Sequence, residues 1–128
     1  MSAQTARILV VDDEPISLKV LASTLQREGY EVVCHDAGES AKHCLAQDNQ
    51  FDVIILDRLM PGVDGMALLA HIQADERLSH IPVVMLTGVD DSEEIIDAVA
   101  AGVFDYLTKP VDGKQLLGLI KKELNKER

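Results

Sequence analysis

The sequence predicts an α/β fold: a single doubly wound (βα)5 domain in which five parallel strands form one sheet with helices on both faces. Five short apolar runs alternate with five segments of helical periodicity, which is the pattern of repeated βα units. The runs are apolar at consecutive positions, as expected for strands covered on both sides. The 128 residues match one typical domain, and no internal repeat, low-complexity segment or long linker appears. We therefore expect residues 1–128 to form one domain with a folded core of about residues 7–125.

Each predicted strand is a run of apolar residues bounded by turn-forming residues. The five runs are 7–11, 30–35, 51–56, 82–86 and 103–107. The third run is too apolar for a solvated sheet edge, and it ends abruptly at Asp57 before a loop that contains Pro61 and Gly62. The strands therefore predict a buried sheet with one acid at the tip of a strand.

The predicted helices lie between these runs. Pro15 suits the first turn of the first helix, and Gly29 suits the residue just after its end. The second helix spans 38–48, the third 65–74, and the last 115–124. The fourth helix begins at the capping-box-like segment 91–94, carries Ile95, Ile96 and Val99, and ends at Gly102.

Composition and charge exclude several classes of function. Hydrophobic residues make up 47% and charged residues 27%, which is typical of a soluble globular domain. The net charge of −10 would repel nucleic-acid phosphates and anionic lipid headgroups, so we expect no direct nucleic-acid binding and no membrane association. The first apolar run is too short for a signal peptide or a membrane span, and we expect a cytoplasmic protein.

The two cysteines do not predict a metal site. Cys34-His35 and His43-Cys44 are close in sequence, but neighbouring strand residues point to opposite faces and the pairs lack zinc-site spacing. We expect buried cysteines and surface histidines, without a disulfide.

Polar side chains follow four of the five strands. Asp12 and Asp13 follow the first strand, Asp57 the third, Thr87 ends the fourth, and Lys109 follows the fifth. Because right-handed crossovers place the carboxyl ends of parallel strands at one edge of the sheet, we expect these side chains to converge there. Each residue alone has an ordinary structural explanation, since Asp is common at helix starts and Thr in strands. Their coincidence at one edge indicates a site.

The charges of this cluster predict its chemistry. Two carboxylates about 4 Å apart repel by about 4 kcal/mol at an effective dielectric constant near 20, so three acids together require a cation. Mg²⁺ suits them because it binds one or two carboxylates, keeps several waters and shares a phosphate oxygen. Asp57 is the candidate nucleophile because a carboxylate can form an acyl phosphate. Lys109, Thr87 and the backbone N–H next to Gly88 are the candidate donors to the phosphoryl oxygens.

These residues resemble the response-regulator receiver domain of two-component signalling, the CheY-like family. The resemblance rests on the acidic pair after the first strand, the segment 57–65 with its Met-Pro and Asp-Gly, Thr87 and the Lys109-Pro110 dipeptide. It extends from Ile8 to Leu124, essentially the whole chain. It implies the flavodoxin-like strand order 2-1-3-4-5, which is known for this family, whereas the residues alone leave the order open.

The resemblance also implies individual roles. Asp57 resembles the phosphoacceptor, Asp13 a direct Mg²⁺ ligand, Asp12 a ligand acting largely through water, and the Leu59 backbone carbonyl a further ligand. Thr87 and Tyr106 resemble the hydroxyl and aromatic residues of the phosphorylation switch. The bond between Lys109 and Pro110 would be cis, although only about 5 to 6% of X–Pro bonds are.

The implied function is that of a phosphoacceptor switch, a regulatory domain that catalyses only its own phosphorylation and dephosphorylation and is not otherwise an enzyme. The donor would be a phosphohistidine on a sensor histidine kinase or on a histidine phosphotransfer protein. The fourth helix, fifth strand and fifth helix would form the face that controls an output domain or a downstream protein. A phosphorylation-dependent homodimer through that face is a further option.

Two apolar positions predict slow autodephosphorylation. Leu59 lies two residues after Asp57, and Val89 two residues after Thr87. By family analogy both flank the path of a water that attacks the phosphoryl group, and neither offers a polar group to orient that water.

Three alternatives remain open. A haloacid-dehalogenase-type phosphohydrolase needs a second acid two residues after the nucleophile, where this chain has Leu59. A flavodoxin-like cofactor binder needs a phosphate loop after the first strand, where residues 12–14 are all acidic. The third is a degenerate receiver that only scaffolds partners, and against it none of the expected acids, threonine or lysine is missing.

Overall fold

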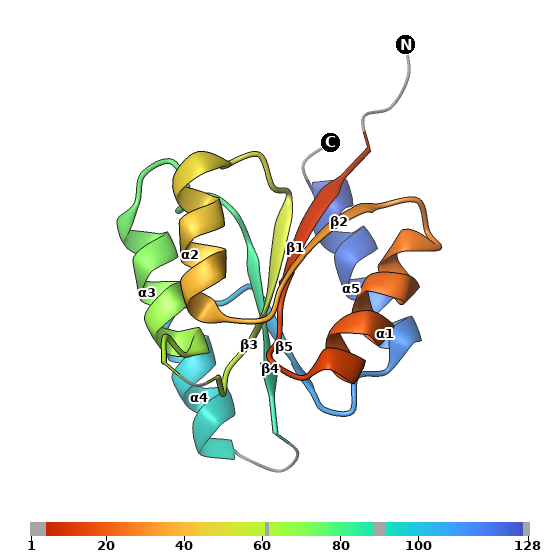
Figure 1. Cartoon of the computed structure of the whole chain (residues 1–128). Helices are drawn as coiled ribbons and strands as arrows, with labels where there is room; N and C mark the ends of the chain where they lie inside the picture. The colour runs from red at the N-terminus through yellow and green to blue at the C-terminus, as the bar shows by residue number, and fades with distance from the viewer. Residues whose placement is uncertain (1–4, 61, 89–91, 127–128) are drawn as a thin grey trace.

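The computed structural model describes residues 5–60, 62–88 and 92–126, and it confirms the predicted α/β fold (Figure 1). Five parallel strands form one sheet in the order β2-β1-β3-β4-β5. The strands are β1 Arg7–Val11, β2 Glu31–His35, β3 Val53–Asp57, β4 Val83–Thr87 and β5 Asp105–Thr108. This order is the one implied by the family resemblance.

Helices cover both faces of the sheet. On one face lie α1 (Pro15–Gln26) and α5 (Gly113–Lys126), and on the other lie α2 (Gly38–Gln47), α3 (Gly65–Ala74) and α4 (Ser92–Ala100) (Figure 1). No helix in the described part of the chain is long and apolar enough to span a membrane.

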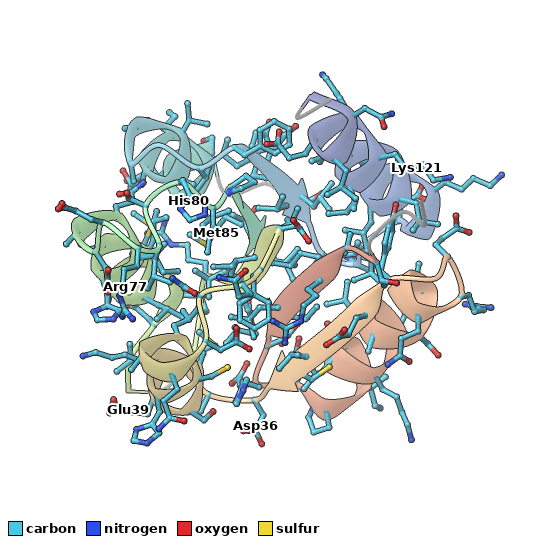
Figure 2. All side chains as sticks on the ribbon, turned by 90° about the horizontal axis from the view of Figure 1, so that it is seen from above. Asp36, Glu39, Arg77, His80, Met85 and Lys121 are labelled. Atoms are coloured by element: carbon cyan, nitrogen blue, oxygen red, sulfur yellow. The ribbon has the colours of Figure 1, made fainter. Side chains whose placement is uncertain are left out.

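The sheet separates two hydrophobic cores. Ile54 and Leu56 of β3 face the core under α2, α3 and α4, whereas Val53 and Ile55 face the core under α1 and α5. Figure 2 shows Met85 in the interior, whereas Arg77 and Lys121 lie at the periphery. Strand residues alternate between faces, and each face of β3 packs into one of the two cores. Both sets of side chains on β3 are therefore buried, as its continuous apolar run predicts.

Several element ends differ from the prediction by one to three residues. Helix α1 ends at Gln26, and residues 27–29 form a turn that closes at Gly29, whose φ of 93° suits glycine. Strand β3 extends to Asp57 because this residue still pairs with Leu86 of β4. Helix α5 begins earlier than expected because the Asp112 carboxylate accepts a hydrogen bond of 2.9 Å from the backbone N–H of Lys114, a cap not predicted from the sequence.

The prediction of buried cysteines is wrong for Cys34, which is exposed, while Cys44 is partly buried. The reason is the position of β2 at the edge of the sheet, where less of the molecule covers it. Both cysteines are free, and within the described residues neither belongs to a group that would hold a metal. On α4, Ala98 is buried, whereas Ile96 and Val99 are exposed.

Arg7 links neighbouring segments at the edge of the sheet opposite the carboxyl ends of the strands. Its guanidinium donates to Glu31 at 2.9 Å and to both oxygens of Asp48 at 3.1 and 3.0 Å. It also lies 4.6 Å from the centre of the Phe51 ring, a cation–π contact. Its pKa is raised, first by the hydrogen bond to Asp48 and then by that to Glu31. These contacts join β1, β2 and the segment before β3, far from the carboxyl edge.

Candidate functional site

The carboxyl ends of the strands, where most of the predicted site residues are found, lie at the lower end of the molecule in Figure 1. Asp57 is the last residue of β3 and Thr87 the last of β4, while Asp12 directly follows β1 and Lys109 directly follows β5. Asp57 is 5% exposed and Asp12 is completely buried. The fold thus brings together groups that are up to 97 residues apart in sequence.

The three acids form a compact group. Asp12, Asp13 and Asp57 each place a carboxylate oxygen within 4.8 Å of the other two. Asp13 is partly buried and Asp12 is fixed by local donors, since Asp12 Oδ2 accepts from Ser17 Oγ at 2.7 Å and Asp12 Oδ1 from the backbone N–H of Glu14 at 3.0 Å. Among the described residues this is the only group of His, Cys, Asp or Glu with such spacing.

The ammonium group of Lys109 lies among the acids. Lys109 Nζ is 3.2 Å from Asp57 Oδ2, 3.1 Å from Asp12 Oδ2 and 2.7 Å from Glu14 Oε1. The backbone N–H of Lys109 donates to the Thr87 carbonyl at 2.9 Å, and the Lys109–Pro110 peptide bond is cis, as predicted. Burial lowers the pKa of Lys109, but hydrogen bonds to Glu14 and Asp12 and the charge of Asp57 outweigh it, so the pKa is raised and the amine is cationic.

Asp57 is unusually basic for an aspartate. Its pKa is raised to about 7, first by burial and then by the neighbouring charge of Asp12, while Lys109 opposes the shift. The repulsion inferred from the sequence is therefore present, and Lys109 offsets only part of it. A further positive charge beside Asp57 would lower its pKa and favour the ionised carboxylate at neutral pH.

The acid group fits a small hard cation. Ligand oxygens on one Mg²⁺ lie about 2.9 to 4.2 Å apart when each Mg–O bond is about 2.1 Å, and a group within 4.8 Å needs little adjustment. Asp12, Asp13 and Asp57 are all oxygen donors, and Asp13 is partly open to solvent, which leaves room for waters and a phosphoryl oxygen. The donor chemistry thus supports the predicted metal.

Thr87 carries a hydroxyl that is buried without a hydrogen-bond partner among the described residues. A buried hydroxyl in this state costs roughly 1–3 kcal/mol of stability, which a hydrogen bond to a ligand oxygen at the strand tip would recover.

The other predicted site residues lie close by in the sequence or on β5. Gly88 follows Thr87 and is partly buried. Tyr106 is also partly buried and packs against the core under α4. Leu59 is 63% exposed, whereas Val89 lies outside the described residues.

Sequence reasoning overlooked three contributions to the site. Glu14 makes the shortest of the three acid contacts of Lys109 Nζ, and Ser17 holds Asp12, although the sequence predicts a role for neither residue. Gly65 lets helix α3 begin against the backbone of Asp57, because a Cβ there would meet the Asp57 carbonyl oxygen and lie 2.6 Å from the Arg58 Cα. The Asp64-Gly65 pair was the available signal for Gly65. A polar side chain in the first turn of the helix after the acidic pair was the signal for Ser17.

An apolar groove of about 540 Å³ adjoins the site between α1 and α5. Most of its lining side chains are apolar, and they include Ile16 and Val20 of α1 as well as Pro110 and Val111. Glu14 and Lys109 also line it, so it opens directly beside the acid group.

The chain is a parallel α/β domain whose carboxyl edge carries a buried aspartate, two more acids that could hold a metal ion with it, and a lysine. Residues 8–121 match the family model of the response regulator receiver domain. The chain therefore belongs to the response regulator receiver family and is a signal-transduction domain of two-component systems.

Known relatives agree with this assignment. The chain is 38% identical to the response regulator PleD of Caulobacter vibrioides over 117 residues, which cover 91% of this chain and 26% of PleD. It is 36% identical to protein PilH of Pseudomonas aeruginosa over 115 residues, or 90% of this chain and 94% of PilH. The crystal structure of a response regulator receiver domain protein from Clostridium thermocellum has a TM-score of 0.87 at 33% identity, with 95% of this chain and 96% of that chain covered.

Proposed function

We propose that this receiver domain is a phosphoacceptor switch in which Asp57, with Mg²⁺, takes a phosphoryl group from a phosphohistidine. The observation that carries the proposal is the placement of Asp57, buried at the tip of β3, beside Asp12 and Asp13 and 3.2 Å from Lys109 Nζ. An aspartate with a purely structural role would not need two further acids and a lysine beside it.

In the proposed reaction, an Asp57 carboxylate oxygen attacks phosphorus and forms an acyl phosphate. The bond between phosphorus and the donor imidazole nitrogen breaks, its electron pair stays on nitrogen, and the ring recovers a proton from solvent. Asp12, Asp13, Asp57 and the Leu59 backbone carbonyl would hold Mg²⁺, which would neutralise the acids and bind a phosphoryl oxygen. Lys109 and the Gly88 backbone N–H would donate to the other phosphoryl oxygens.

The proposed switch uses the buried hydroxyl of Thr87. Its Oγ1 has no hydrogen-bond partner among the described residues, so a phosphoryl oxygen on Asp57 would satisfy it. Movement of Thr87 would vacate space for the ring of Tyr106, which pairs with Met85, two residues before Thr87 on the neighbouring strand. The α4-β5-α5 face would change with it and control an output domain or a downstream protein, including by a phosphorylation-dependent homodimer.

Incubation with Mg²⁺ and acetyl phosphate tests the function, with intact-mass spectrometry as the readout. We expect one hydroxylamine-sensitive phosphoryl group per chain, and no adduct when EDTA removes the metal. Continuous turnover of the phosphodonor without an adduct would indicate a hydrolase and contradict the proposal. Absence of both adduct and turnover would indicate a domain that only scaffolds partners.

The proposed partner is a sensor histidine kinase or a histidine phosphotransfer protein, and the groove between α1 and α5 is its proposed docking surface. A donor histidine must reach Asp57, and the groove opens beside Lys109 and Glu14. We expect Val20→Glu to slow phosphotransfer from a protein donor by about tenfold or more, as loss of a central apolar contact does. Phosphorylation by acetyl phosphate should be unchanged.

Val99→Glu is the matched control for this prediction. Val20 and Val99 are both 57% exposed and both lie on helices, but Val99 is on α4, away from the groove. Equal rates of phosphotransfer to the two variants would argue against docking in the groove.

The apolar side chain of Leu59 predicts a long-lived acyl phosphate. Leu59 is 63% exposed, so its replacement should not disturb the core, and an asparagine there would offer an amide to orient an attacking water. We expect the acyl phosphate of the Leu59→Asn variant to have a lifetime about tenfold shorter than that of the wild type, measured as loss of the adduct in Mg²⁺ buffer. A wild-type lifetime of only seconds, with no phosphatase present, would refute slow autodephosphorylation.

A further inference from the structure

We infer that Ser17 is a positioning residue for metal binding, which acts by holding the carboxylate of Asp12. The inference rests on the proposed Mg²⁺-dependent function and adds a residue to it. The observation is the 2.7 Å hydrogen bond from Ser17 Oγ to Asp12 Oδ2.

Ser17 is one of two local donors that fix both oxygens of Asp12. Its hydroxyl donates to Oδ2, and the backbone N–H of Glu14 donates to Oδ1 at 3.0 Å. Because an ionised carboxylate only accepts hydrogen bonds, the direction of the Ser17 bond is settled by chemistry. Asp12 is completely buried, so loss of a donor leaves its carboxylate short of one hydrogen bond unless a water enters in place of the donor.

The start of helix α1 explains why Ser17 reaches Asp12. Pro15 is the first residue of the helix, so Ser17 is in the first turn, next to the end of β1. Glu14, at the N-cap position, makes no side-chain capping bond. The short polar side chain of Ser17 bonds instead to the acid that directly follows β1, and couples α1 to the metal group.

Lys109 is not an equivalent support for Asp12. Its ammonium is shared among Asp12, Asp57 and Glu14, at 3.1, 3.2 and 2.7 Å. In the proposed reaction Lys109 turns to a phosphoryl oxygen, which weakens its contact with Asp12. Ser17 and the Glu14 N–H are then the donors that keep Asp12 oriented toward the cation or toward its water.

Isothermal titration of the unphosphorylated chain with Mg²⁺ tests this inference. Residues that orient metal ligands typically contribute about 10- to 100-fold to affinity, so we expect Ser17→Ala to weaken the Mg²⁺ Kd by about tenfold or more. Ser17→Thr keeps a hydroxyl and should stay within about threefold of wild type, whereas Ser17→Val, of similar shape, should behave like Ser17→Ala. Ser23→Ala, an exposed serine on the same helix, is the control and should leave the Kd unchanged.

Urea denaturation in EDTA separates positioning from a purely structural role. If Ser17→Ala and Ser17→Val lower the stability of the metal-free fold but bind Mg²⁺ like wild type, the inference is wrong. Equal Kd values for Ser17→Thr and Ser17→Val would also overturn it, even if the alanine variant failed to fold. Failure of the wild type itself to bind Mg²⁺ would overturn the proposed function and this inference together.

Discussion

Replacement of Asp57 with asparagine should abolish the Mg²⁺-dependent phosphoryl adduct and, without metal, make the folded chain more stable than wild type at pH 8. An amide is a poor nucleophile, which accounts for the loss of the adduct. The gain in stability follows from burial and the charge of Asp12, which raise the pKa of Asp57 to about 7. Ionisation of this buried group therefore opposes folding.

The pH dependence has a definite sign. The pKa of Asp57 is higher in the folded chain than the usual value of 3.8, so the folded state binds the proton more tightly. Its contribution to stability is fully present below about pH 4 and is lost as pH rises to about 7. At pH 8 without metal we expect Asp57→Asn to be more stable than wild type by about 2–4 kcal/mol, from urea denaturation in EDTA.

Two comparisons make this prediction specific to Asp57. Asp36→Asn removes the same charge from an exposed position at the periphery in Figure 2, and it should change stability by less than about 0.5 kcal/mol. Mg²⁺ should stabilise the wild type and have much less effect on Asp57→Asn. If wild type and Asp57→Asn lose stability in parallel between pH 4 and 8, then the pKa of Asp57 is not raised in the folded chain.

Loss of the Lys109 ammonium should slow phosphorylation by about 10²- to 10³-fold, the usual effect of removing one donor that stabilises charge in a transition state. We expect this for Lys109→Met with acetyl phosphate, measured as the initial rate of adduct formation. Lys109 Nζ lies 3.2 Å from Asp57 Oδ2, so it is placed to follow an oxygen that becomes part of the acyl phosphate. Folding should survive in the Mg²⁺ of the assay, since the side chain of Lys109 is not part of either core and the cation would offset the charge of the acids.

Lys121→Met is the control for the loss of one positive charge. Lys121 is exposed on α5, where it pairs with Glu28 at 3.2 Å, far from the acids. The Lys121→Met variant should be phosphorylated at the wild-type rate. A phosphorylation rate for Lys109→Met within threefold of wild type would contradict the proposed role of Lys109 in the reaction.

The sequence predicted the sheet and the acid group because both depend on local patterns. A continuous apolar run that ends at Asp57 is sufficient to place a carboxylate at the tip of a buried strand, and the order of the remaining acids, Thr87 and Lys109 along the chain identifies their edge. The strand order needed the family resemblance, since alternating strands and helices are compatible with several orders. The structure and the match to the receiver family confirm this order.

Other features depend on packing that no local pattern reports. The pKa of Asp57 reflects the depth of its burial, and the contact of Glu14 with Lys109 joins residues 95 positions apart. The apolar strand around Cys34 predicts a buried thiol, but its exposure follows from the edge position of β2.

The location of the phosphoryl group is the most direct test of the proposed switch. Wild-type protein would be phosphorylated with acetyl phosphate and Mg²⁺, reduced with borohydride to convert an acyl phosphate into an alcohol, and mapped by peptide mass spectrometry. We predict one modified residue, a homoserine at position 57. A modification at Asp12, Asp13 or a histidine, with position 57 intact, would contradict the claim that the domain is organised around Asp57 as its phosphoacceptor.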